Sequence, residues 1–235
     1  MRYLALASDY DGTLAHHGAV DAETIEALRR LAASGRKLIL VTGRQIDDLL
    51  QVFPEVTIFD QVIGENGALI YQPKRRELRT LAEPPPPEFV EALRKRGVDP
   101  LAVGHVVVAT VQPNETVALD VIRELGLELQ VIFNKGSVMI LPASVNKATG
   151  LAAGLGELQL SPHNVVGIGD AENDHAFLAM CECGVAVANA LDSLKAHADL
   201  VTKGRASEGV REIIESLLAD DLECCEPGRA ARTRS

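Results

Sequence analysis

The chain has 235 residues, of which 47% are hydrophobic and 24% charged, a composition ordinary for a globular protein of one large or two modest domains. Its formal net charge of −10 argues against binding to nucleic acid or anionic membranes, and its aromatic content of 3% leaves few rings for stacking on single strands. Since no apolar stretch approaches the ~18 residues of a membrane-spanning helix, we expect a cytoplasmic protein. No feature of the sequence points to an oligomeric state.

The first predicted element is a buried strand over 3–7, followed directly by Asp9 and Asp11. Residues two apart in an extended segment point to the same side, and ligands of open α/β sheets bind beyond the carboxyl ends of the strands. Two close carboxylates repel each other unless a cation or a shared proton intervenes. We therefore expect both side chains to converge on one ligand, with Gly12 letting the chain turn away.

Helix and strand patterns then alternate. Asp21 is placed to cap a helix that Gly35 ends, and the apolar run 38–41 is typical of a central parallel strand. A helix is expected from Arg44 to Phe53, where Pro54 stops it, and two further strands follow over 62–71.

The pattern changes at Pro73, where a charged stretch and a polyproline run begin. Residues 74–143 are expected to form an inserted α+β unit of their own. Its predicted elements are a helix over 88–96, a single strand over 103–111, a helix from Asn114 to Gly126, and strands 129–133 and 137–141 joined by a short turn.

Alternation resumes after Pro142, with helices over 147–158, 174–181 and 208–218 and strands over 165–168 and 185–187. The simplest architecture is α/β, a Rossmann-like doubly wound parallel sheet with helices on both faces, formed by residues 1–73 and 144–222. Residues 223–235 lack apolar periodicity and are predicted to be a disordered tail.

The cysteines stand at 181, 183, 224 and 225. Their spacing fits no common zinc pattern. In a cytoplasmic protein, we expect all of them to be free thiols.

Three predicted parallel strands end in polar residues of complementary type. Asp9 and Asp11 follow the first strand, Thr42 and the Gly43 amide the second, and Asp170 the third. Oxygen ligands of this kind suit Mg²⁺, and hydroxyl, amide and ammonium donors suit a phosphoryl group. The remaining members of this set are Asn173 and Asp174 in the loop after Asp170, and Lys147 at the start of a helix.

These motifs closely resemble those of the haloacid dehalogenase superfamily, and more narrowly those of its Cof-type phosphatases. The matching segments are 9–14, 41–44, Lys147 and 169–174, with lesser matches at 65–68, 188–190, 198–202 and 208–210. The resemblance covers about residues 3–218 and implies that the insert 74–143 is a mobile cap. Tyr10 stands where an aliphatic residue is more usual.

The resemblance implies a phosphatase that works in two steps. Asp9 attacks phosphorus and becomes an aspartyl-phosphate, while Asp11 protonates the leaving oxygen and later activates water. It further implies Mg²⁺ held by Asp9, Asp170 and the carbonyl of Asp11, with Asp174 supporting the metal or Lys147. The phosphoryl oxygens would be contacted by Thr42, the Gly43 amide, Lys147 and Asn173.

The substrate is expected to be a small phosphorylated metabolite, such as a sugar phosphate or a phosphoglycolate-like acid. Cap residues that could reach it are His105, Asn134, Lys135 and Ser137. A phosphomutase of the same superfamily and a catalytically silent binding module remain the alternatives. A dehalogenase has no need of a second acid at Asp11.

Overall fold

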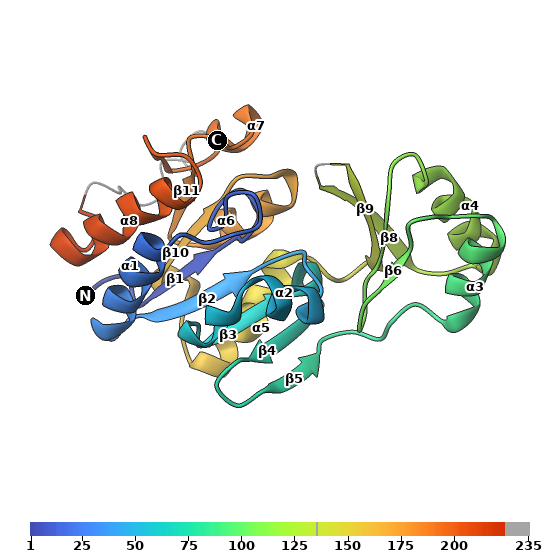
Figure 1. The fold of residues 1–235 in the computed structure, drawn as a ribbon, viewed down its shortest axis with the longest axis horizontal. Coiled ribbons are helices and arrows are strands. Elements are labelled where there is room, and N and C mark those ends of the chain that lie inside the picture. The colour runs from blue at the N-terminus through green and yellow to red at the C-terminus, as the bar shows by residue number, and fades with distance from the viewer. Residues whose placement is uncertain (135, 224–235) are drawn as a thin grey trace.

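The computed structural model describes residues 1–134 and 136–223, and it has two lobes of unequal size (Figure 1). The larger lobe, the core, is built on an eight-stranded sheet, and the smaller lobe, the cap, on a four-stranded sheet. The chain crosses from core to cap and back once, so the cap is an insertion in the core.

The core sheet is parallel except at one end, where β4 runs antiparallel to both of its neighbours, β3 and β5. The predicted doubly wound α/β fold is thereby confirmed, because the strand order reverses direction on either side of β1. Its strands in spatial order are β12 (Leu200–Val201), β11 (Cys183–Ala186), β10 (Val165–Gly169), β1 (Ala5–Ser8), β2 (Lys37–Val41), β3 (Gln61–Gly64), β4 (Leu69–Gln72) and β5 (Glu77–Thr80).

Helices cover both faces of this sheet, as right-handed crossovers require. One face carries α1 (Ala22–Ala33), which Asp21 caps through the Thr24 amide, packed against α8 (Ser207–Asp220). The other face carries α5 (Lys147–Leu158) and α6 (His175–Met180). The short helices are α2 (Ile46–Val52), α7 (Asp192–Lys195), η1 (Pro54–Ile58), η2 (Glu65–Gly67), η3 (Pro162–Asn164) and η4 (Glu172–Asp174).

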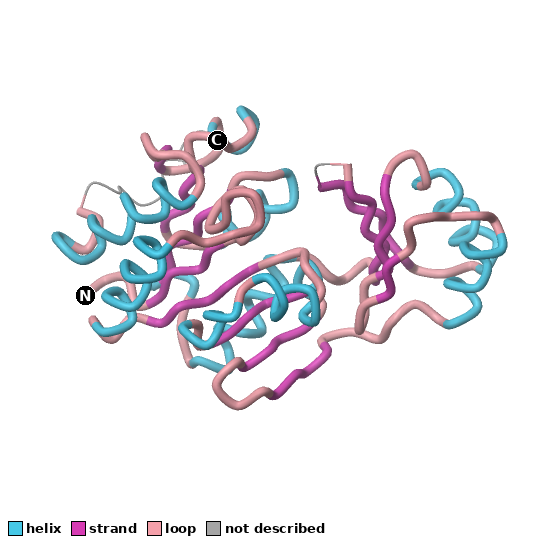
Figure 2. Tube along the Cα trace, viewed as in Figure 1, coloured by secondary structure: helices cyan, strands magenta, loops and turns pink. Residues whose placement is uncertain are grey.

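The cap is an antiparallel sheet with two helices on the face turned away from the core (Figure 2). Its strands in spatial order are β6 (Ala102–Val103), β7 (Val108–Val111), β9 (Ser137–Pro142) and β8 (Leu129–Asn134), and its helices are α3 (Pro87–Lys95) and α4 (Glu115–Leu125). The helices bury Phe89, Leu93 and Val121 against the sheet, so the cap has an apolar core of its own.

Two parts of the cap region differ from expectation. The segment Glu77–Thr80, expected in the cap, is β5 and pairs with β4 in the core sheet, because the charged run at 74–76 makes a hairpin turn. The single strand expected over 103–111 is wrong, since β6 and β7 form a hairpin around residues 104–107. The amides of that hairpin turn bond a side chain of the core, which is described below.

The expectation of free cysteines holds for Cys181, which is buried and free. It is wrong for Cys183, which is disulfide-bonded. The remaining cysteines and the predicted disordered tail lie outside the described residues, apart from Glu223.

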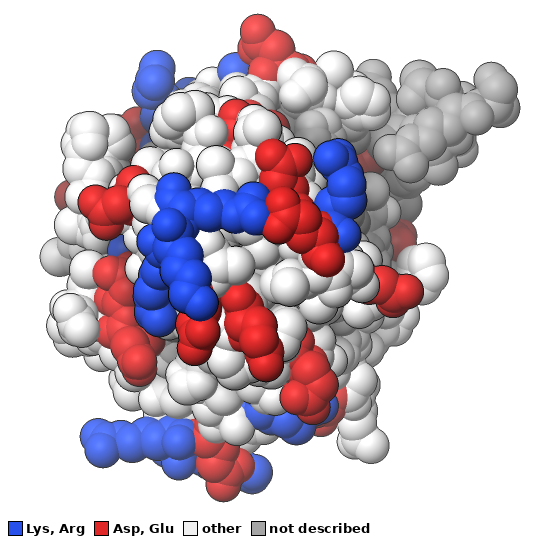
Figure 3. All heavy atoms as spheres, turned by 90° about the vertical axis from the view of Figure 1, so that its right-hand side faces the viewer, with Lys and Arg blue, Asp and Glu red and all other residues white. Residues whose placement is uncertain are grey.

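The end of the molecule formed by the cap carries charges of both signs. Figure 3 looks onto this end and shows Lys and Arg side chains interspersed with Asp and Glu. Some of them form exposed pairs on α3 and α4, such as Lys95 with Glu91 at 3.9 Å and Arg123 with Asp120 at 3.5 Å. Among the described residues, no helix is long and apolar enough to cross a membrane.

Candidate active site

A cleft of about 520 Å³ lies between the two lobes at the carboxyl edge of the core sheet. The core side of its lining is polar and the cap side is mostly small or apolar. The lining residues are Asp9, Asp11, Gly43, Arg44, Gln45 and Asp48 from the core, and Ala102, Ala109, Asn134, Ser137 and Met139 from the cap.

A buried ion cluster lies at the core side of this cleft. Lys147 begins α5, where Asn146 caps the helix, and its ammonium is 2.6 Å from Asp9 Oδ1 and 2.5 Å from Asp174 Oδ1. Asp9 follows β1 and Asp174 ends η4, so the cluster joins three segments that are far apart in the sequence. All of these side chains are buried, which makes their mutual pairing necessary.

Burial and charge shift the pKa values of this cluster. Burial raises the pKa of the Asp9 carboxyl to about 7, against the opposing effect of Lys147. Burial alone would lower the pKa of Lys147, but the adjoining carboxylates of Asp174 and Asp9 outweigh it and raise that pKa. The ammonium therefore stays charged while Asp9 carries less negative charge than an exposed carboxyl would.

The Asp170 loop adds a third carboxylate to the cluster. Asp174 Oδ2 accepts hydrogen bonds from the amides of Asp170 at 2.8 Å and Ala171 at 2.9 Å, and Thr13 donates to Asp170 Oδ1 at 3.3 Å. Oxygens of Asp9, Asp170 and Asp174 all lie within 4.8 Å of one another. Three buried carboxylates beside one ammonium leave an excess of negative charge that a cation would balance.

Asp11 points to a different partner. Arg44 binds it through two nitrogens, Nε at 2.7 Å and Nη2 at 2.8 Å, and also reaches Asp48 at 2.5 Å. The guanidinium carbon lies 5.3 Å from the centre of the Tyr10 ring. Arg44 thus holds Asp11 at the edge of the cleft in a fixed geometry.

The expected phosphate-contacting residues surround the cluster. The Thr42 hydroxyl is buried and accepts a hydrogen bond from the Arg44 amide at 3.1 Å. Gly43 lines the cleft, and a Cβ there would lie 3.3 Å from Met139 of the cap and 3.9 Å from Asn173. Asn173 donates to the Asn66 side chain at 2.9 Å, so its amide is held next to the Gly43 loop.

The chain matches a known family along most of its length. The haloacid dehalogenase-like hydrolase family matches residues 6–126 and 115–214. The chain belongs to this family. This match confirms the superfamily that the sequence motifs indicate, and the full-length relatives described next support a phosphatase, a phosphoric monoester hydrolase.

Two curated relatives and one solved structure illustrate this membership. The phosphoglycolate phosphatase of Methanothermobacter thermautotrophicus is 28% identical over 91% of this chain and 98% of its own length. That of Archaeoglobus fulgidus is 30% identical over 91% and 96%. A HAD/COF-like hydrolase from Plasmodium vivax shares the fold with a TM-score of 0.79 at 20% identity, over 92% and 96% of the two chains.

The expected cap contacts are met in part. Asn134 and Ser137 line the cleft, whereas Lys135 lies outside the described residues. His105 is not among the described lining residues, and its amide bonds Glu65 instead.

Sequence reasoning gave no role to several residues of the site. Arg44 stands directly after Gly43 in a matched motif, and Glu65 and Asn66 lie in a lesser match, so their positions were visible although their partners were not. Thr13, which follows Gly12 in the first motif, bonds Asp170. Contacts between distant segments are the part that a single sequence does not display.

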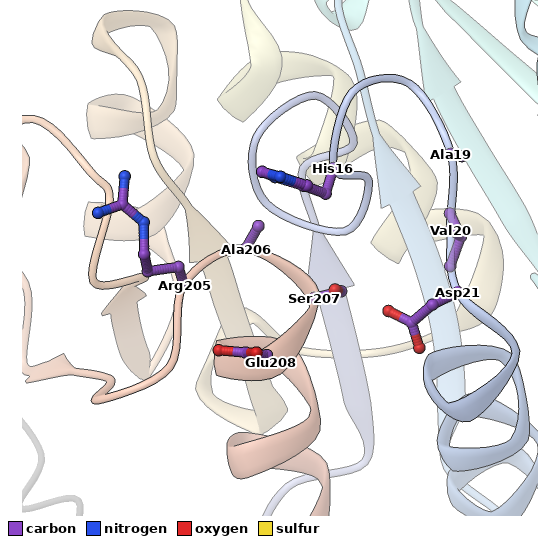
Figure 4. Close-up of a pocket in the computed structure, with 8 residues that line it drawn as sticks. All are labelled: His16, Ala19, Val20, Asp21, Arg205, Ala206, Ser207 and Glu208. Carbon is purple, nitrogen blue, oxygen red and sulfur yellow. The ribbon is translucent and has the colours of Figure 1, made fainter.

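A second cavity of about 430 Å³ lies away from the catalytic motifs, where the loop after Asp11 meets the start of α8 (Figure 4). His16 lines it, together with Asp21 and Glu208. Among the described residues, the group of side chains able to hold a metal is the one at Asp9, Asp170 and Asp174, which does not include His16.

Proposed function

We propose that this phosphatase is magnesium-dependent and hydrolyses a small phosphorylated acid, of which phosphoglycolate is the first candidate, through an aspartyl-phosphate on Asp9. The observation that carries the proposal is the buried cluster of Asp9, Lys147 and Asp174, from which Asp9 lines the same cleft as Asp11. It supplies a nucleophile, a cation that steadies it and a second carboxyl for proton transfer.

In the first step, a carboxylate oxygen of Asp9 attacks phosphorus and the bond from phosphorus to the leaving oxygen breaks. Asp11 gives its proton to that oxygen, which departs as the alcohol. Lys147 contacts Asp9 Oδ1 and keeps the carboxylate oriented. Lys147, Thr42 and the Gly43 amide balance the charge that grows on the phosphoryl oxygens.

In the second step, Asp11 takes a proton from water while the water oxygen bonds to phosphorus. The bond between phosphorus and Asp9 breaks, which releases inorganic phosphate and restores both carboxyls. Asn173 is proposed to contact the phosphate from beside Gly43. Arg44 binds both oxygens of Asp11 at the edge of the cleft, so Asp11 has to exchange one of these contacts for the proton that it transfers.

The donor set fits Mg²⁺, which prefers a few carboxylate oxygens together with substrate oxygens and water. Asp9 and Asp170, with the main-chain carbonyl of Asp11, are proposed to hold it, and bound Mg²⁺ would supply positive charge to the phosphoryl group. Both oxygens of Asp174 already accept hydrogen bonds from Lys147 and the Asp170 loop. We therefore propose that Asp174 supports the metal site by positioning Lys147 and the Asp170 loop.

The choice of a small acidic substrate is supported by the relatives. The relatives named above are phosphoglycolate phosphatases. Among the described lining residues, Arg44 carries the positive charge. On the cap side, Ala102, Ala109 and Ser137 have small side chains. A cytoplasmic location remains a prediction.

The test is phosphate release from a panel of phosphoglycolate, sugar phosphates and p-nitrophenyl phosphate, with Mg²⁺ and with EDTA. We expect Mg²⁺-dependent phosphate release with the highest kcat/KM for phosphoglycolate. The Asp9→Asn variant should release no phosphate. Release from a sugar phosphate instead would move the substrate class while keeping the chemistry.

Two other outcomes would overturn the proposal. Interconversion of sugar phosphates without phosphate release would indicate a phosphomutase. Release from no compound, p-nitrophenyl phosphate included, would indicate a catalytically silent module.

A further inference from the structure

The turn Glu65–Gly67, called the junction turn below, lies where core and cap meet and has no part in the chemistry described above. Its three residues are buried. They have positive φ angles of 49°, 59° and 100° in succession. Non-glycine residues keep this left-handed conformation only where surrounding contacts fix it, so the contacts of the turn are informative.

The Glu65 carboxylate binds the cap. Oε1 accepts a hydrogen bond from the amide of His105 at 2.8 Å, and Oε2 accepts from Val106 at 2.8 Å and Val107 at 2.9 Å. The side chain is fully buried, so these charge-assisted bonds satisfy it without water. The bonded amides form the turn between β6 and β7, whose strands carry Ala102 and Ala109 into the cleft.

The same turn is bonded to the loops expected to contact phosphate. The amides of Glu65 and Asn66 donate to the carbonyls of Arg44 at 3.1 Å and Thr42 at 2.9 Å. The Asn66 side chain accepts from Asn173 at 2.9 Å. Gly67 packs so closely on the carbonyl before Lys147 that a Cβ would lie 2.0 Å from that oxygen. The cap hairpin and the loops that are expected to contact phosphate are therefore both bonded to one short segment, the junction turn.

We propose that Glu65 is a positioning residue that sets the depth of the β6–β7 hairpin over the phosphate site and thereby selects small leaving groups. When the core holds the phosphoryl group of a substrate, the leaving group is the part of the substrate that contacts the cap. A hairpin anchored at its turn holds Ala102 and Ala109 at a fixed distance above the phosphate site. A hairpin released from Glu65 would contact small leaving groups less closely and would admit larger ones. The inference rests on the proposed function for the identity of the small substrate.

The experiment compares Glu65→Gln with Glu124→Gln in the full chain with Mg²⁺. Gln has the shape of Glu but turns an N–H₂ group toward main-chain amides that need an acceptor. Glu124 is an exposed cap residue paired with Arg96, so its variant makes the same charge change away from the cleft. The measured quantity is the ratio of kcat/KM for phosphoglycolate to kcat/KM for the bulkier p-nitrophenyl phosphate.

We expect this ratio to fall about tenfold or more in Glu65→Gln, mainly through KM for phosphoglycolate, and to stay unchanged in Glu124→Gln. Gly104→Ala disturbs the same contact from the cap, because its Cβ would lie 2.6 Å from Glu65 Oε1. It should lower the ratio in the same direction.

Hydrogen exchange of the amides of His105, Val106 and Val107 gives a readout that needs no substrate. It should accelerate about tenfold or more in Glu65→Gln and not in Glu124→Gln. Unchanged exchange, or an equal loss of activity on both substrates, would overturn the inference. If the wild type acts on another small metabolite, that compound replaces phosphoglycolate in the ratio, so failure of the proposed substrate remains distinct from failure of the positioning role.

Discussion

The two sides of the cleft differ in kind. The core lining carries three carboxylates and one guanidinium: Asp9 pairs with the buried Lys147, and Arg44 pairs with Asp11 and Asp48. The cap lining carries Ala102, Ala109 and Met139, with Asn134 and Ser137 as its neutral polar groups. We infer that the core side carries out the reaction and that the cap side selects the substrate. Changes on the core side should lower activity on every substrate, and changes on the cap side should alter the ratio between substrates.

The largest effect is expected for Asp9→Asn, which removes the nucleophile from the core side. We expect kcat to fall by at least ~10⁴-fold on phosphoglycolate and on p-nitrophenyl phosphate alike. Steady-state phosphate release measures both. A loss confined to one substrate would break the comparison, because it would give a residue of the core lining a selective role.

Lys147→Met comes next, because it removes the only counter-charge that the described contacts give to Asp9 and Asp174. We expect the free energy of unfolding to fall by about 3–5 kcal/mol in urea, together with a roughly 10³-fold loss in kcat. Lys74→Met is the control, since Lys74 is an exposed residue paired with Asp60 at 3.2 Å. Equal stability of the two variants would contradict the account of the buried cluster.

The pKa of Asp9 predicts a pH-dependent response to magnesium. The folded-state pKa of about 7 lies above the ordinary value of 3.8, so this group stabilises the metal-free fold most at low pH. That contribution is lost as pH rises from about 4 to 7, where Asp9 must ionise while buried. A fixed Mg²⁺ concentration, ~100 times the Kd at pH 8, should therefore raise Tm by roughly 5–10 °C at pH 8 and by clearly less at pH 5, where protonation of Asp9 weakens binding.

Differential scanning calorimetry of the wild type and Asp9→Asn isolates this effect. The variant lacks the titrating group, so its response to Mg²⁺ should vary little between the two pH values. A larger Mg²⁺ effect at pH 5 than at pH 8 in the wild type would show that Asp9 does not titrate as inferred.

The smallest effect is expected on the cap side, for Asn134→Ala. Its side-chain oxygen is buried without a hydrogen-bond partner in the described part of the chain, and it lines the cleft. We expect kcat/KM for phosphoglycolate to change by about 3- to 10-fold through KM, while inhibition by inorganic phosphate stays the same. A change in phosphate inhibition would place this residue among the groups that contact the phosphoryl.

The core side could be predicted from the sequence because parallel strands end at one edge of a sheet. Asp9, Thr42 and Asp170 each follow a short apolar run, so their convergence follows from the alternation of strands and helices. The ion cluster adds Lys147, which a capped helix start places at the same edge.

The cap side could not be predicted to the same depth. Residues 103–111 have the composition of one strand. The Glu65 carboxylate, some 40 residues earlier, accepts hydrogen bonds from the amides of His105 to Val107, and these residues form a turn that divides the run into a hairpin. The bidentate contact between Arg44 and Asp11 likewise joins two segments that no local pattern relates. Propensity and periodicity describe neighbours in sequence, whereas these contacts depend on where whole elements pack.

The most direct measurement is a rapid-mixing experiment with Asp11→Asn and p-nitrophenyl phosphate in Mg²⁺. Nitrophenolate leaves without needing a proton, so Asp9 should still be phosphorylated, whereas hydrolysis of the intermediate needs Asp11 as base. The account predicts a burst of about one nitrophenolate per protein followed by slow turnover, with phosphate recovered on the peptide that contains Asp9. A slow linear release with no burst and no phosphorylated Asp9 would contradict it.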